Sequence, residues 1–95
     1  MKIVVKGYER WLPNGDRILV EAFKVNNPLY KYGVVYTFRC ISENDETLFA
    51  VENSHGKPHI HLKERKIETD WDWEYALAKF DEMVREHERK LGMRK

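Results

Sequence analysis

Three of the four histidines in this chain lie within ten residues, in a stretch that also contains a glycine, a lysine and a proline. Glycine and proline are typical of a loop or a bend. Histidine exchanges protons near neutral pH and, when neutral, binds metal ions, so the stretch is where the sequence offers chemistry. It consists of Glu52, Asn53, Ser54, His55, Gly56, Lys57, Pro58, His59, Ile60 and His61.

The spacing of the histidines suggests how they meet. His59 and His61 are separated by one residue, and in an extended segment side chains two residues apart point to the same face. His55 precedes the bend at residues 56–58 and could fold back toward this pair. Three interpretations compete: histidines that only shape a loop, histidines that bind a metal ion, and histidines that act as an acid and a base.

In the metal interpretation, His55, His59 and His61 bind a divalent ion, with Glu52 as a further ligand. Three imidazoles would leave one position for water on a zinc-like ion. A dedicated site usually adds acidic or cysteine ligands at helical or hairpin spacing, which this stretch does not show. The metal site is therefore the less favoured alternative, and no cofactor is predicted.

In the acid–base interpretation, the histidines cleave RNA without a metal. One takes the proton of the 2′-hydroxyl, another protonates the leaving 5′ oxygen, and Lys57 or Arg39 stabilises the charge that builds on the phosphorane. Phosphate affinity would come from a local basic strip that consists of Lys57, Lys63, Arg65 and Lys66. The candidate catalytic residues are His59, His61, His55 and Lys57. The candidate substrate-binding residues are Arg39, Asn53, Glu52, Lys63 and Arg65.

Strands must hold this stretch in place. The strongest predicted strand is rich in β-branched and aromatic residues, and a short polar turn connects it to the strand that ends in Glu52 and Asn53. A connection this short joins antiparallel neighbours, so the two form a hairpin. An Asn-Gly pair predicts an earlier tight turn. The predicted strands cover residues 3–5, 17–25, 34–41, 47–53 and 62–68.

The last third of the chain predicts one long helix. Thr69 or Asp70 can cap it, apolar residues recur at helical spacing from Trp73 onward, and Gly92 ends it. Basic side chains near its end suit the negative end of the helix dipole, with phosphate contact as the functional alternative. These basic residues are Arg85, Arg89, Lys90, Arg94 and Lys95.

The predicted fold is therefore α+β: an antiparallel sheet of four or five strands in a meander, with one long C-terminal helix packed on one face. Residues 1–95 are expected to form a single domain. Such a helix has an apolar stripe that only a sheet can bury here. Trp11, Trp71 and Trp73 are expected at the interface between helix and sheet.

Composition limits the function classes. The 17 basic and 16 acidic side chains nearly cancel, so bulk charge predicts neither a nucleic-acid-binding protein nor an acidic tail. Cys40 is the single cysteine and is expected to be a small buried hydrophobe in a reducing cytoplasm. No apolar run reaches the roughly 20 residues that span a bilayer, and the first residues do not resemble a signal peptide. Abundant Lys, Arg and Glu without Gln is typical of thermophile proteins.

Several features occur in a defined order: a Tyr-Lys-Tyr-Gly segment that leads into a strand, a strand that ends in Glu52-Asn53, a Gly-Lys-Pro-His-Ile-His run at residues 56–61, and a terminal helix. This order resembles the small toxin proteins of the TumE-like toxin–antitoxin family over roughly residues 10 to 90. The resemblance implies an intracellular toxin that acts on RNA and is inhibited by a cognate antitoxin, often a helix-turn-helix protein.

Position by position, Asn53, His59 and His61 match the family's motif, and the approach strand matches at Lys31 and Tyr32. The chain departs from the pattern in three ways. It has a Glu where the family often has Asp before the motif asparagine, it has one additional histidine, and its C-terminus is basic. The longer carboxylate side chain reaches about one methylene further out than the Asp of the family.

The expected function is thus that of a toxin component that cleaves RNA, with His59 and His61 as acid and base. The alternatives are a non-catalytic module that binds RNA or protein, and a histidine-based metal-binding domain. Catalysis requires the two rings to converge within about 7 Å around an open pocket, because both must reach one phosphate. The expected partners are an antitoxin and RNA, and no membrane is expected. An exposed edge strand would also allow a homodimer.

Overall fold

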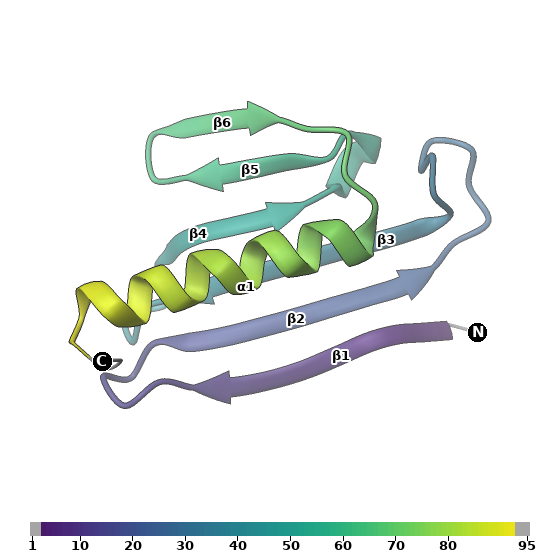
Figure 1. Cartoon of the computed structure of the whole chain (residues 1–95). Helices are drawn as coiled ribbons and strands as arrows, with labels where there is room; N and C mark the ends of the chain where they lie inside the picture. Colours follow the sequence, from purple (N-terminus) through teal and green to yellow (C-terminus); the bar gives the residue numbers. More distant parts are fainter. Residues whose placement is uncertain (1–2, 93–95) are drawn as a thin grey trace.

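The computed structural model describes residues 3–92 as a six-stranded antiparallel sheet with one long helix (Figure 1). The strands lie in the sheet in chain order, so each pairs with the next and the sheet is a meander. The predicted α+β class is confirmed, but the sheet has six strands and not four or five. The elements are β1 (Ile3–Trp11), β2 (Arg17–Lys24), β3 (Val34–Ile41), β4 (Thr47–Glu52), η1 (Ser54–Gly56), β5 (His59–Leu62), β6 (Arg65–Glu68) and α1 (Trp73–Lys90).

The additional strand comes from the segment around the histidines. β5 and β6 form a hairpin closed by Lys63 and Glu64, a turn that lacks the Asn or Gly that usually marks one. The prediction of one strand over residues 62–68 was wrong for this reason. Only the first part of the histidine stretch is a bend, since His59 and His61 lie on β5 and pair with β4.

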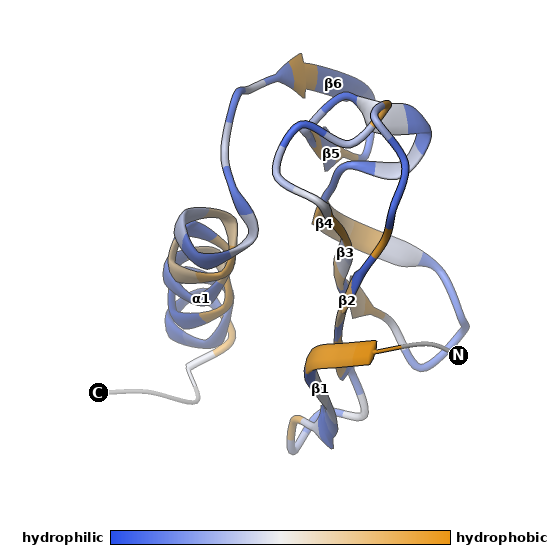
Figure 2. Ribbon diagram, turned by 90° about the vertical axis from the view of Figure 1, so that its right-hand side faces the viewer, coloured by the Kyte–Doolittle hydropathy of each residue, from blue (hydrophilic) through white to orange (hydrophobic). Residues whose placement is uncertain are grey.

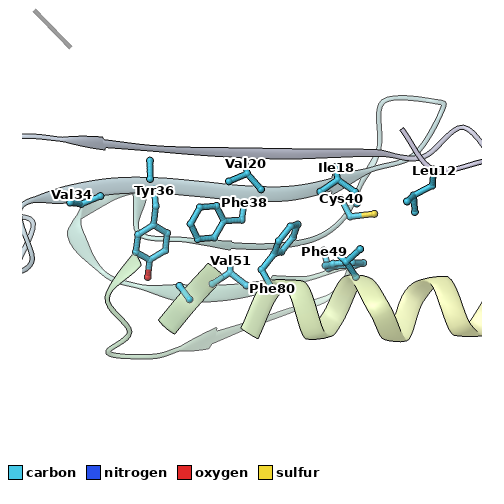
Figure 3. Close-up of a cluster of buried hydrophobic side chains, with 13 residues drawn as sticks. Leu12, Ile18, Val20, Val34, Tyr36, Phe38, Cys40, Phe49, Val51 and Phe80 are labelled. Atoms are coloured by element: carbon cyan, nitrogen blue, oxygen red, sulfur yellow. The ribbon is translucent and has the colours of Figure 1, made fainter. Parts of the chain in front are cut away.

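The core lies between α1 and the face of the sheet that α1 covers (Figures 2 and 3). Phe80 of the helix packs against Phe38 and Phe49, with ring centroids 5.9 and 5.7 Å apart. The helix is capped by Asp72, whose carboxylate accepts a hydrogen bond from the Tyr75 backbone N–H at 2.9 Å. The predicted cap at Thr69 or Asp70 was therefore wrong by two or three residues, because the apolar stripe that the sheet buries begins only after Asp72.

The opposite side of the sheet, which we call the open face, faces away from α1 (Figure 2). Trp11 is 61% exposed, so its expected place at the helix–sheet interface was wrong, whereas Trp71 and Trp73 do pack against the core. Arg94 and Lys95 of the predicted basic cluster lie outside the described residues. Among the residues described, none of the helices is long and apolar enough to cross a membrane.

Candidate functional site

Two rows of side chains cross the open face from β3 to β6. Cross-strand partners in a sheet have their Cβ atoms about 4.5–5.5 Å apart, so the register alone brings each row together. The predicted shared face of His59 and His61 is confirmed. The first row is Arg39, Ala50, His61 and Lys66, and the second is Thr37, Glu52, His59 and Glu68.

Ala50 creates a hollow at the centre of the first row. It lies between Arg39 and His61, and its short side chain leaves the space that a longer residue would fill. The hollow has a volume of about 200 Å³ and is open to solvent through the exposed His61 ring and the 44% exposed Arg39 side chain. Its lining residues are Arg39, Thr47, Ala50, Glu52 and His61.

Glu52 is the most constrained side chain in this hollow. Its Oε1 accepts a hydrogen bond from Ser54 Oγ at 2.8 Å and lies 3.4 Å from His59 Nε2. Its Oε2 faces Arg39 Nη2 at 3.7 Å. One hydrogen bond and two longer polar contacts thus restrict the orientation of this carboxylate, which lines the hollow.

His59 and His61 differ in what they can reach. Their ring centroids are 6.4 Å apart, within the expected separation, and the rings meet edge to face. His59 is only 4% exposed, and its Nδ1 donates to the Lys57 carbonyl at 3.0 Å while its Nε2 faces Glu52. His61 is exposed and lines the hollow. Of the two rings, His61 is therefore the one positioned to touch a bound molecule.

The other predicted catalytic residues lie outside the hollow. His55 is exposed in η1 with a left-handed φ of 66°, and Lys57 contributes its backbone carbonyl to His59. Asn53 is buried. Its Nδ2 donates to the Val34 carbonyl at 2.7 Å, and its Oδ1 accepts from the Tyr36 N–H at 2.8 Å. Asn53 therefore extends the pairing of β3 and β4 beyond the end of β4.

The predicted basic strip is divided between the two faces of the β5–β6 hairpin. Lys63 is exposed in its turn. Arg65 pairs with Leu62, so it lies on the side of the sheet that faces α1, whereas Lys66 pairs with His61 on the open face. Strand alternation thus places Lys66, and not Arg65, beside the hollow.

Sequence reasoning did not assign a role to Ala50 or Ser54, and it treated Glu52 as a substrate-binding residue or a further metal ligand, not as a base. The signal for Glu52 and Ala50 is the register of β4 against β3 and β5. It places Ala50 directly between Arg39 and His61, and it places Glu52 two residues along the same strand, diagonal to both. This register depends on pairing between distant strands. The Glu52 contacts could therefore be found only once that pairing was known.

A separate cluster lies on the side of the sheet that faces α1. Over residues 3–92, one group of three potential metal ligands has its ligand atoms within 4.8 Å of one another, and it consists of Asp16, Cys40 and His87. The predicted set of His55, His59 and His61 does not form such a group there. Burial raises the pKa of the Cys40 thiol to about 12, so the free thiol is not a nucleophile at neutral pH.

Comparisons with known proteins do not assign this chain to a family. No protein-family model, curated protein or solved structure matches it. The resemblance to TumE-like toxins stays a prediction from the sequence, and the function has to be argued from the geometry of the site.

Proposed function

We propose that this chain cleaves RNA at the hollow on its open face, as the toxin component of a toxin–antitoxin pair. The observation that carries the proposal is that a carboxylate, an imidazole and a guanidinium, from Glu52, His61 and Arg39, line one solvent-open hollow. These three groups supply a base, an acid and a cation. Together they can supply the proton transfers and the charge stabilisation of RNA transesterification without a metal ion.

In the proposed reaction, the Glu52 carboxylate takes the proton of a ribose 2′-hydroxyl. The 2′ oxygen attacks the adjacent phosphorus, and the bond from phosphorus to the 5′ oxygen of the next nucleotide breaks. The His61 imidazolium donates its proton to that leaving oxygen. The products are a 2′,3′-cyclic phosphate and a free 5′-hydroxyl. Arg39 stabilises the negative charge that develops on the phosphorane oxygens.

The remaining residues position these groups or bind the strand. Ser54 Oγ holds Oε1 of Glu52 through a hydrogen bond, His59 Nε2 lies 3.4 Å from the same oxygen, and Oε2 is left on the side of Arg39. His59 is therefore a positioning residue, a change from its expected role as acid or base. Lys66 follows His61 in the same row and adds positive charge for a phosphate next to the cleaved one.

The experiment uses the purified chain and short single-stranded RNA in a chelating buffer. We expect a 2′,3′-cyclic phosphate product, and no cleavage where the 2′ oxygen is methylated. Loss of a proton-transfer group lowers the rate by roughly 10² to 10⁴, so His61→Ala should show a loss in this range. Arg39→Ala should also lose activity, while Arg85→Ala, a matched arginine exposed on α1, should not.

The sequence predicted His55 as a catalytic residue, but it lies outside the hollow. We therefore expect His55→Ala to retain RNA cleavage. Expression in cells tests the toxin part: growth should stop with the natural chain and continue with His61→Ala. RNA that binds without being cleaved would replace this proposal with the alternative of a non-catalytic binding module. Cleavage that survives His61→Ala would refute the assigned site.

A further inference from the structure

We propose that Asp16, Cys40 and His87 form a binding site for a zinc-like divalent ion, on the side of the sheet opposite the RNA site. The three side chains come from the β1–β2 turn, from β3 and from the last turns of α1. Their ligand atoms lie within 4.8 Å of one another. One carboxylate, one thiol and one imidazole are the donor types that zinc binds in proteins.

The geometry of the cluster is close to that of a metal site. Asp16 Oδ2 and His87 Nε2 are 2.7 Å apart and share a hydrogen bond. Two such ligands on a tetrahedral zinc ion are about 3.3 Å apart, given metal–ligand distances near 2.0 Å. Replacing the shared proton by an ion therefore requires these atoms to separate by only about 0.6 Å. The Cys40 Sγ lies within 4.8 Å of both atoms, and ion binding would draw it to about 3.5 Å, the separation that a tetrahedral zinc site gives a sulfur and a nitrogen or oxygen ligand.

The site is enclosed on one side and open on the other. Cys40 and Asp16 are buried, and Figure 3 shows Cys40 on the core side of the sheet near Leu12. The side chain of His87 is 20% exposed and lines a separate hollow of about 490 Å³ between α1 and β4–β5. Of the three ligands, His87 is thus the one that lines a hollow, and three protein ligands leave the fourth position on a zinc ion to water.

Neighbouring groups are compatible with a bound cation. Asn14 Nδ2 donates to Asp16 Oδ2 at 3.0 Å, in the manner of an outer-shell partner that orients a ligand. Arg10 is the nearby positive charge, and it is paired with Glu88 at 3.9 Å. Metal binding displaces the proton of a coordinating thiol into solvent, so the bound Cys40 thiolate and Asp16 would together neutralise a divalent ion.

The test adds Co²⁺ and then Zn²⁺ to the folded full chain. Cobalt bound to a thiolate shows a sulfur-to-metal charge-transfer absorption, and Cys40 is the only cysteine that could produce it. We expect this absorption to saturate at one equivalent of Co²⁺ and to disappear on competition with Zn²⁺. No such absorption in the folded chain would overturn the proposal, whether or not any variant folds.

Variants then assign the ligands. Cys40→Ser and His87→Gln should weaken Zn²⁺ binding by more than the roughly 10- to 100-fold that loss of an outer-shell partner causes. Asp16→Asn keeps a hydrogen-bonding side chain beside His87 and should weaken Zn²⁺ binding while the chain stays folded. His61→Ala removes a histidine from the open face and should leave the cobalt spectrum unchanged. Equal Zn²⁺ affinity in all of these variants and the natural chain would refute the site.

Discussion

Glu52 is held from three directions, by Ser54, His59 and Arg39. A general base has to be presented in one orientation, and these contacts fix it. Glu52→Gln keeps the shape and removes the basic oxygen, so we expect cleavage to fall roughly 10²- to 10⁴-fold with folding unchanged. The measurement is a single-turnover assay for the cyclic phosphate product. Glu68→Gln, a neighbour on the open face, is the matched control and should remain active.

For Asn53 we expect a loss of stability and not of activity, because its side-chain amide is hydrogen-bonded to the backbone of β3. Asn53→Ala leaves the Tyr36 N–H and the Val34 carbonyl without these partners, and a buried group left unpaired costs about 1–3 kcal/mol. We expect a lower free energy of unfolding in urea with RNA affinity of the folded protein retained. Asn44→Ala, in an exposed turn, is the control. Lost affinity at full stability would instead support the substrate-binding role that the sequence suggested.

At the scale of elements, the β5–β6 hairpin presents adjacent basic residues to opposite faces. Lys66 lies beside His61 on the open face, and Arg65 lies on the other face with Leu62. Lys66→Glu should weaken RNA binding. It should also reduce the slope of log affinity against log salt concentration by about 1, the value for one lost phosphate contact. Arg65→Glu makes the same charge change and should have little effect. Equal losses in the two variants would show that RNA does not follow the open face.

At the scale of the whole molecule, α1 covers one face of the sheet, and the core of residues 3–92 lies between them. Tyr36 lies in it and donates its hydroxyl to the Trp71 carbonyl at 2.9 Å. Burial raises the pKa of Tyr36 above its ordinary value of 10, with smaller contributions from Asp72 and other nearby groups. The folded state thus keeps a proton that the unfolded state releases above pH 10.

This proton difference predicts alkaline destabilisation. The contribution of Tyr36 is fully present below pH 10 and is lost as pH rises above it, because the unfolded state then binds fewer protons. Tyr36→Phe should lose about 1 kcal/mol at neutral pH, from the hydrogen bond, yet show a shallower fall in unfolding free energy above pH 10. Urea unfolding at several pH values measures both. Parallel pH profiles would contradict the prediction.

The open sheet leaves β1 and β6 as its two edges, which bears on assembly. An edge strand exposes unpaired backbone groups that can pair with another chain. The expected homodimer and the expected antitoxin both remain predictions. Gel filtration of the purified chain, followed by coexpression with a candidate antitoxin, would test them separately.

Much of the fold follows from local patterns in the sequence. β3 and the start of β4 lie where β-branched and aromatic runs predicted strands, and α1 follows the apolar repeat after Asp72. The predicted strand over residues 3–5 was too short, because β1 continues through a run of exposed residues to Trp11. The turn at Lys63 and Glu64 was not predicted, because it contains no Gly or Asn. Local rules thus placed the elements, and the errors occurred where a turn or an exposed strand lacks a local signal.

The sequence by itself determined that a strand would lead through Glu52 and Asn53 into the histidine stretch, that His59 and His61 would share a face, and that one helix would bury an apolar stripe against a sheet. These properties depend on residues close together in the chain. Only the tertiary structure decided that His59 is buried against Glu52, that Ala50 opens a hollow, and that Lys66 faces it. Those outcomes depend on the register between strands, where a shift of one residue exchanges the two faces of a strand.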